Sequence, residues 1–279
     1  MTTKNSDGTG NGDAEVGQGQ RPEAPNLSRI CMALLQQGNA LAPSDTVQAL
    51  TICTTVLDSL LQASTEQLES ERLISELRAM ALLLRANCIA FGSKGKPDAL
   101  DELHPLYEAA LRVAEKLADG PPAARLILMR AWRAYAAALA AFGDHQQAQA
   151  YLLQLQKHLD RGEDEGLWLQ ACAQMADLQW AQGKTDLAVE MLDEALIYPE
   201  GHDRICQDYV SCLVLLARIL WHANDRKLAR QLARQAVNEV NRIGDRCHPL
   251  FPDRVRTLTG VFGFRNYERM VASIHCPRL

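Results

Sequence analysis

The sequence has few of the features that mark exported, membrane-spanning or metal-binding proteins. Aromatic residues make up only 5% of the 279 residues, and no two of the eight cysteines are spaced C-x-x-C. The first twenty residues carry no apolar core of the kind that a signal peptide needs, and no apolar run approaches the roughly 18 residues that span a bilayer. We therefore expect a cytoplasmic protein with free thiols and no membrane partner, because disulfides persist mainly in oxidising compartments.

Catalytic motifs are also missing. The seven histidines form no H-E-x-x-H pair, no G-x-S-x-G sequence occurs, and the segment from Gly92 to Lys96 lacks the preceding strand and the spacing of a phosphate loop. No group of side chains has the pattern that nucleophilic or acid–base catalysis requires. The sequence predicts a protein that is not an enzyme and that has no catalytic residue, metal or cofactor.

Helix-forming segments rich in Leu and Ala, separated by short breaks, fill most of the chain. Residues 1–26 are an exception, because Gly, Asn, Asp, Thr and Gln bury too little apolar surface to offset their ordering entropy, and we expect a disordered leader there. The first helix should run from Asn26 to Gln37 and end at Gly38. Ser64 and Gln67 predict a capping box before the third helix. The other helices are expected near 45–63, 64–91, 97–118, 123–142, 145–161, 164–182, 185–198, 203–223 and 225–243.

Three features of the later helices recur at a step of 40 and then 41 residues. A small residue in the first helix of each unit recurs as Ala136, Ala176 and Ala217. The turn residue recurs as Gly143, Gly183 and Asn224. A small residue in the second helix recurs as Ala148, Ala188 and Ala229. Small residues let the two helices of a hairpin approach closely, and Gly or Asn ends a helix best, so the period predicts repeated helical hairpins.

These repeats resemble the tetratricopeptide repeat, whose pattern is W-x2-L-G-x2-Y … A-x3-F … P. Trp132, Ala136, Ala148 and Leu152 fit that pattern best, and a weaker unit lies 49 residues upstream, where Leu83 corresponds to Trp132. The longer period is similar to helical sensor and interaction domains of bacterial regulators. The resemblance implies an all-α, right-handed superhelical stack of antiparallel helix pairs, a tetratricopeptide-like solenoid, over residues 27–246. Residues 247–279 would form a C-terminal capping segment with short helices near 252–260 and 265–274.

The family resemblance also implies a binding groove on the first helix of each pair. Positions one, four, eight and eleven beyond the start of a unit line that groove in the family. In this sequence the corresponding partner-binding candidates, with His222 beside them, are Arg130, Arg133, Asp177, Trp180, Arg218, Trp221 and His222. Arg grips carboxylates and carbonyls, and Trp supplies large contact area, so this set suits a peptide or another protein. Two structural alternatives remain: Trp180 and Trp221 pack against the next helix pair, and the arginines form a solvated rim.

A basic face is expected on the last repeat helix. Arg226, Arg230 and Arg234 recur every four residues and therefore share one side of that helix. This face could dock an acidic partner, or it could be the polar outer surface that a terminal repeat needs. The net charge of −5 and the lack of a helix-turn-helix pattern disfavour a nucleic-acid partner.

The sequence thus favours a non-enzymatic scaffold or adaptor that binds another protein or a peptide in its concave groove, in bacterial regulation or complex assembly. The alternative is a ligand- or peptide-sensing domain of a transcriptional or signalling system. A third hypothesis is a homodimer through the C-terminal helices, with Phe262, Phe264 and Tyr267 buried between the subunits.

Overall fold

The chain is all-α throughout the part that its computed structural model describes, which is residues 27–42, 44–62, 71–93, 99–159, 161–162, 164–197, 207–243 and Val255. Ten helices and no strand occur in these ranges. The helices are α1 (Leu27–Leu41), α2 (Thr46–Gln62), α3 (Glu71–Gly92), α4 (Ala99–Glu115), α5 (Pro122–Ala141), α6 (His145–His158), α7 (Glu165–Ala181), α8 (Thr185–Leu196), α9 (Gln207–His222) and α10 (Arg226–Ile243).

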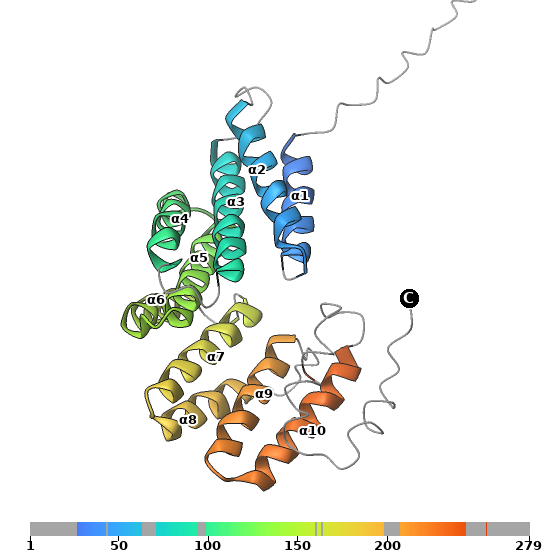
Figure 1. Ribbon diagram of the computed structural model, residues 1–279, viewed down its shortest axis with the longest axis vertical. Coiled ribbons are helices and arrows are strands. Elements are labelled where there is room, and N and C mark those ends of the chain that lie inside the picture. Colours follow the sequence, from blue (N-terminus) through green and yellow to red (C-terminus); the bar gives the residue numbers. More distant parts are fainter. Residues whose placement is uncertain are drawn as a thin grey trace, which may run out of the picture.

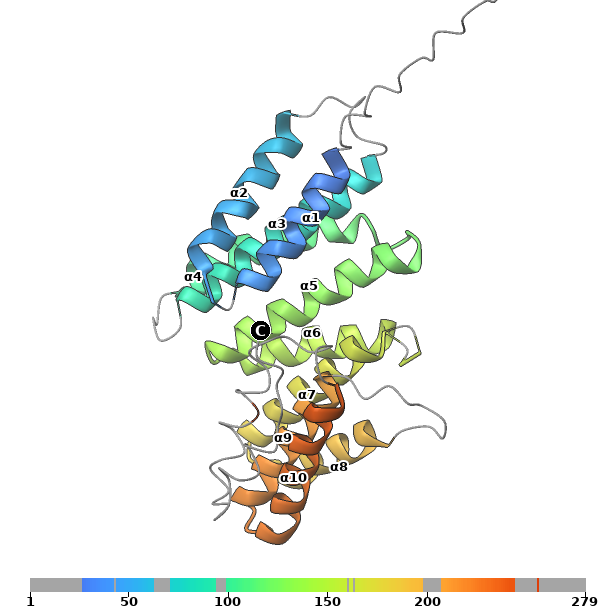
Figure 2. The ribbon, with the colours of Figure 1, turned by 90° about the vertical axis from the view of Figure 1, so that its right-hand side faces the viewer.

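Helices that follow each other in the chain pack against each other in space. The hairpins α1–α2, α3–α4, α5–α6, α7–α8 and α9–α10 are each in contact, and each hairpin touches the next. The hairpins follow one another along the long axis, from α1 and α2 at one end to α9 and α10 at the other (Figures 1 and 2). The odd-numbered helices also contact one another in order, α1 with α3, α3 with α5, α5 with α7 and α7 with α9. They form a continuous row.

The predicted turn residues end their helices in the same way three times. Gly143, Gly183 and Asn224 have φ values of 92°, 80° and 69°, in the left-handed region that favours Gly and Asn. The amide of the following residue bonds back to the carbonyl five positions earlier, at Leu139, Gln179 and Leu220. This bond pattern is the Schellman motif, and its recurrence confirms that the sequence period is a structural period.

The small residues of the repeat lie where the two helices of each hairpin meet. All six are buried, with exposed fractions of 0–1%: Ala136, Ala176, Ala217, Ala148, Ala188 and Ala229. Asp144 and Asp225 cap the second helices α6 and α10, because their carboxylates accept the amides of Gln147 and Leu228 at 3.0 and 3.1 Å. Lys184, at the same place before α8, makes no such side-chain bond.

The expected end of the first helix at Gly38 is wrong. The helix continues to Leu41, and Gly38 is buried inside it. A Cβ at this position would lie 2.8 Å from Leu84 Cδ2 and 3.3 Å from Ile52 Cγ2. The glycine therefore serves the close packing of α1 on α2 and α3, and not a turn. The expected leader (1–26), the capping box at Ser64 and Gln67 and the two short tail helices lie outside the described residues.

Two general expectations concern the described helices. Five cysteines there are free and buried, as small apolar residues would be: Cys31, Cys53, Cys88, Cys172 and Cys212. None of the helices in these ranges combines the length and the apolar character that crossing a bilayer requires.

Candidate functional site

A cleft of about 390 Å³ lies on the row of odd-numbered helices. One residue each from α1 and α9, Asn39 and Asp208, marks its two ends along the row. Between them, α3, α5 and the N-terminal region of α7 supply the walls, which comprise Met80, Leu83, Leu84, Asn87, Ile127, Arg130, Arg133, Ala134, Asp164, Gly166, Leu167 and Gln170. The cleft thus has an apolar wall and several charged or amide side chains that converge from different hairpins.

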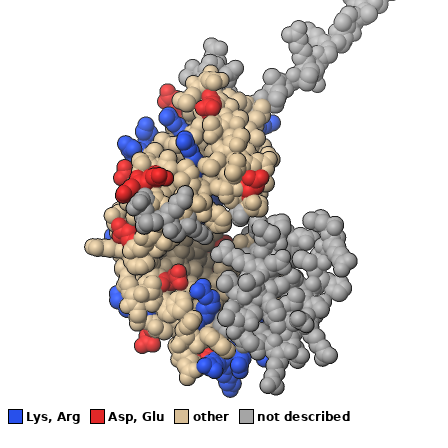
Figure 3. All heavy atoms as spheres, in the orientation of Figure 1, with Lys and Arg blue, Asp and Glu red and all other residues tan. Residues whose placement is uncertain are grey.

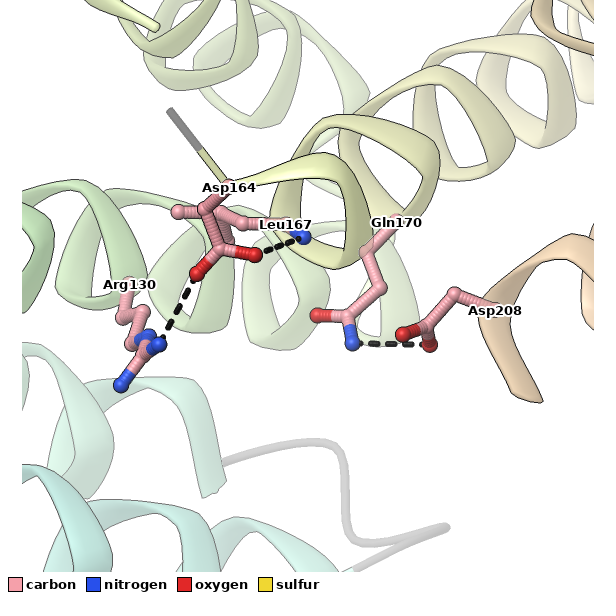
Figure 4. Close-up of polar contacts among 5 residues, drawn as sticks. All are labelled: Arg130, Asp164, Leu167, Gln170 and Asp208. Atoms are coloured by element: carbon pink, nitrogen blue, oxygen red, sulfur yellow. Dashed lines mark hydrogen bonds and ion pairs between the residues drawn. The ribbon is translucent and has the colours of Figure 1, made fainter. Parts of the chain in front are cut away.

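One ion pair joins α5 to the start of α7. Arg130 Nη2 lies 2.9 Å from Asp164 Oδ2, and the other carboxylate oxygen of Asp164 accepts the amide of Leu167 at 3.0 Å (Figure 4). Asp164 therefore caps α7 and neutralises Arg130 at the same time. The Arg130 side chain is 54% exposed, so this pair contributes little to stability, about 0–1 kcal/mol.

A second acidic group, Asp208, reaches the cleft from the first turn of α9. Gln170 Nε2 donates a hydrogen bond of 2.8 Å to its Oδ1 (Figure 4). Its Oδ2 lies 3.0 Å from where a Cβ on Gly166 would be, so the absence of a side chain at Gly166 leaves room for the carboxylate. Burial raises the pKa of Asp208; the Gln170 bond and Arg133 oppose that rise, and Asp164 adds to it. The carboxylate is thus held in a place that solvates it poorly.

Arg133 brings a half-buried positive charge to the same cleft. Its guanidinium contacts Gln174 of α7, whose amide oxygen we place 3.0 Å from Nη1 and whose amide nitrogen lies 3.3 Å from the Arg133 carbonyl oxygen. The buried Nε has no hydrogen-bond partner within the described part of the chain. Burial lowers the pKa of Arg133, and the charge of Asp208 acts in the opposite direction. The Nε atom is thus out of contact with water, while the side chain as a whole is half-buried.

Aromatic residues from α4 and α5 support the floor of the cleft. Tyr107 donates a hydrogen bond of 2.8 Å to Oδ1 of Asn87, and its ring stacks on Tyr135 with centroids 4.9 Å apart. The Tyr135 hydroxyl in turn bonds to Nδ1 of His104. Burial raises the pKa of Tyr107, and it raises that of Tyr135 to about 12, so both hydroxyls stay protonated at neutral pH. Tyr107 thus holds the Asn87 amide directly, and Tyr135 supports Tyr107.

Three other groove candidates from the sequence meet at a different place. Trp180 of α7 lies beside His222 of α9 with ring centroids 5.4 Å apart, and the guanidinium carbon of Arg218 lies 5.6 Å from the Trp180 ring. Trp180 is half-buried and packs against the core of the last two hairpins. The structural alternative for Trp180 therefore applies at least in part.

Trp221 contacts the basic face instead of the cleft. The guanidinium carbons of Arg226 and Arg230 lie 5.3 and 5.5 Å from its ring, and the ring also packs against the core. Arg234 is exposed one turn further along α10. Figure 3 shows basic side chains gathered at the end of the molecule where the α9–α10 turn lies in Figure 1. Two of the three predicted face arginines thus stack on a tryptophan.

The remaining candidate, Asp177, is exposed and lines a smaller hollow of about 240 Å³ with Ala137 and Ala140 of α5. The structure therefore brings Arg130 and Arg133 together in the main cleft. It places Trp180, Arg218 and His222 in a second group and Trp221 with Arg226 and Arg230 in a third.

Sequence reasoning missed Asp164, Asp208 and Asn87. One signal was present for Asn87, because it takes the position that Ala136 holds in the next unit, and a polar residue there breaks the small-residue pattern. We place the starts of the second and third units at Leu169 and Val210. Asp164 and Asp208 precede these starts, where the period carries no information. The packing of α7 on α5 brings Asp164 to the cleft, and the packing of α9 on α7 brings Asp208 there.

Within the described ranges, no group of three or more His, Cys, Asp or Glu side chains is arranged to hold a metal ion. No known protein family matches the chain, and no curated protein is significantly similar to it.

Proposed function

We propose that this protein is a non-enzymatic interaction module of the cytoplasm, a tetratricopeptide-like solenoid whose concave face binds a partner protein or peptide in bacterial regulation or complex assembly. The observation that supports this proposal is the cleft on the odd-numbered row, to which five helices from five hairpins contribute. A surface that spans several repeats suits an extended ligand, which contacts each repeat in turn.

Capture of the partner by the immobilised full chain tests this proposal. Arg130→Gln should weaken capture because it removes an exposed guanidinium at the cleft, and it should leave the fold intact because the Arg130–Asp164 pair is exposed. Trp180 is less suitable, since its truncation would also remove core contacts.

The matched control for that experiment is Arg112→Gln. Arg112 is exposed on α4, outside the cleft, and among the described residues its hydrogen bond is to the carbonyl of Glu108 in its own helix. Equal capture by the two variants would mean that the partner does not use the cleft. Weaker capture by Arg130→Gln alone supports the proposal.

A second function, the sensing of a small ligand or peptide, is favoured by one specific observation. The cleft has the volume of a small-molecule site, and it contains a half-buried arginine and a half-buried aspartate that lie on different hairpins. A ligand that contacts both would couple α5 to α9. Self-association through the C-terminal helices stays a prediction, since of that segment only Val255 is described, where it is buried against the α9–α10 core.

A further inference from the structure

The charges of the cleft divide into one satisfied pair and two separate charges. Arg130 and Asp164 neutralise each other at 2.9 Å. Arg133 and Asp208 line the same cleft, but no ion pair within 4.0 Å joins them. Each of them has one neutral amide partner, Gln174 for Arg133 and Gln170 for Asp208.

Two opposite charges that are half-buried and not joined are unfavourable for the fold. Each has lost part of its hydration, and neither regains it through direct contact with the other. Amide partners restore part of this loss, because a hydrogen bond to a charged group is worth about 1.5–3 kcal/mol. A group that fits between the two charges and complements both would restore more.

The chemistry of such a group follows from the four charges. The cleft carries two positive and two negative side chains, so its ligand should bear no net charge. One end must be an anion for the guanidinium of Arg133, for which a carboxylate has the matching planar geometry. The other end must be a cation that donates to Asp208 Oδ2, which accepts no hydrogen bond from the described residues.

The wall beside these charges sets the third requirement. Leu83 and Leu84 of α3 and Ile127 of α5 line the cleft next to the charged residues. An apolar side chain on the ligand would bury surface there and add to affinity at roughly 25 cal/mol per Å². A ligand with polar side chains would lose hydration without compensation.

We propose that the cleft binds a small zwitterion with an apolar side chain, an α-amino acid or a short peptide, whose carboxylate contacts Arg133 and whose ammonium contacts Asp208. This inference rests on the sensing function proposed above and names its ligand class. The free amino acid and the short peptide share the same two charged ends, and they differ in how far apart those ends lie.

Isothermal titration calorimetry on the full chain tests the inference with a set of related ligands. L-leucine has both charges, leucine amide lacks the carboxylate, N-acetyl-leucine lacks the ammonium, and glycine lacks the apolar side chain. Leucine or the dipeptide leucyl-leucine should bind at least about tenfold more tightly than leucine amide and N-acetyl-leucine, because each of these two derivatives loses one charged hydrogen bond. Tighter binding of leucine would identify the ligand as a free amino acid, and tighter binding of leucyl-leucine would identify it as a short peptide.

Substitution of each charged residue tests its contact with one end of the ligand. Arg133→Gln should remove the preference for leucine over leucine amide and keep the preference over N-acetyl-leucine. Asp208→Asn should do the reverse. The controls Arg112→Gln and Asp186→Asn change exposed residues outside the cleft and should bind leucine as the unchanged protein does. If Arg133→Gln does not fold, the comparison of the ligands on the unchanged protein still decides.

Two results would overturn the inference: no heat of binding from leucine and leucyl-leucine up to millimolar concentration, or equal binding of leucine and its two blocked derivatives. Neither result affects the capture of a partner protein that depends on Arg130. The experiments therefore distinguish a cleft that binds no zwitterion from a protein that captures no partner through the cleft.

Discussion

At the scale of single residues, the cleft holds charged side chains at places where apolar residues would stabilise the fold more. Asp208 and Arg133 are half-buried charges with neutral amide partners. A Cβ on Gly166 would lie 3.0 Å from Asp208 Oδ2, so the glycine leaves room for that carboxylate. Residues selected for packing alone would be apolar at such places. Charged groups that lie in a cleft and have shifted pKa values are typical of binding sites.

Asp208→Asn should increase stability at neutral pH. Burial raises the pKa of Asp208 above its ordinary value of 3.8, so the folded state binds this proton more tightly than the unfolded state does. The stability that this proton provides is present at low pH and is lost as the pH rises through the raised pKa. The asparagine side chain is neutral at every pH, so the variant does not lose this stability as the pH rises. The melting temperature of the variant should exceed that of the unchanged protein at pH 7, and the gap should shrink near pH 3. A less stable variant at pH 7 would show that the carboxylate stabilises the fold.

Arg161 is a residue whose role no sequence pattern indicated. It lies between α6 and α7, donates hydrogen bonds of 2.9 and 3.3 Å to the carbonyls of Ile197 and Ala195, and stacks 4.6 Å from the ring of Trp168. It thus satisfies carbonyls at the end of α8 that the helix itself leaves open.

Arg161→Ala should therefore destabilise the protein by about 1–3 kcal/mol, through two lost charged hydrogen bonds and a lost cation–π contact. Urea unfolding measures this effect. Arg112→Ala, which removes an exposed arginine with only a local contact, is the control and should change the stability by less than about 0.5 kcal/mol. Equal effects of the two changes would rule out a capping role for Arg161.

At the scale of elements, the helical hairpin is the unit that the sequence encodes most clearly. The left-handed residues at Gly143, Gly183 and Asn224 and the buried alanines on either side were all predictable from the 40–41-residue step. They were predictable because backbone strain and close helix contact restrict these positions to very few residue types. The helix that begins at Pro122 ends at Ala141, one residue before its predicted end at 142, because the turn at Gly143 allows few residue types.

Gly183→Ala should destabilise the α7–α8 hairpin. Gly183 has a φ of 80°, and nothing lies within 4 Å of a Cβ placed there, so the change adds backbone strain and no clash. The expected loss is about 1–2 kcal/mol. Gly162→Ala is the control, because Gly162 is also exposed and open but its φ is not positive. Thermal unfolding of both variants gives the comparison, and a neutral Gly183→Ala would contradict the turn geometry.

Other elements could not be predicted from local signals. Gly38 has the residue type of a helix end but lies at a helix contact, and nothing in its neighbours along the chain distinguishes the two cases. Asp164 looks like an ordinary helix cap, and only its distance to Arg130 shows that it also lines the cleft. Contacts between residues more than 30 positions apart depend on how hairpins pack, and single-sequence patterns do not report that packing.

At the scale of the whole molecule, the row of odd-numbered helices carries the main cleft. Successive odd helices touch one another, so side chains that leave one face of that row converge on a shared cleft. The acidic residues Glu190, Asp193 and Glu194 on α8 belong to the even-numbered helices and are exposed. We therefore propose that recognition occurs on the odd-numbered helices, while α8 presents this acidic surface to solvent.

Site-specific photo-crosslinking tests that assignment most directly. A photoreactive amino acid placed at Met80, which lines the cleft on α3, should form a covalent product with the captured partner. The same amino acid at the exposed Glu190 of α8 should form none. The Met80 product should also decrease when Arg130→Gln is added. A product from Glu190 and none from Met80 would contradict the account, since the partner would then occupy the even-numbered helices.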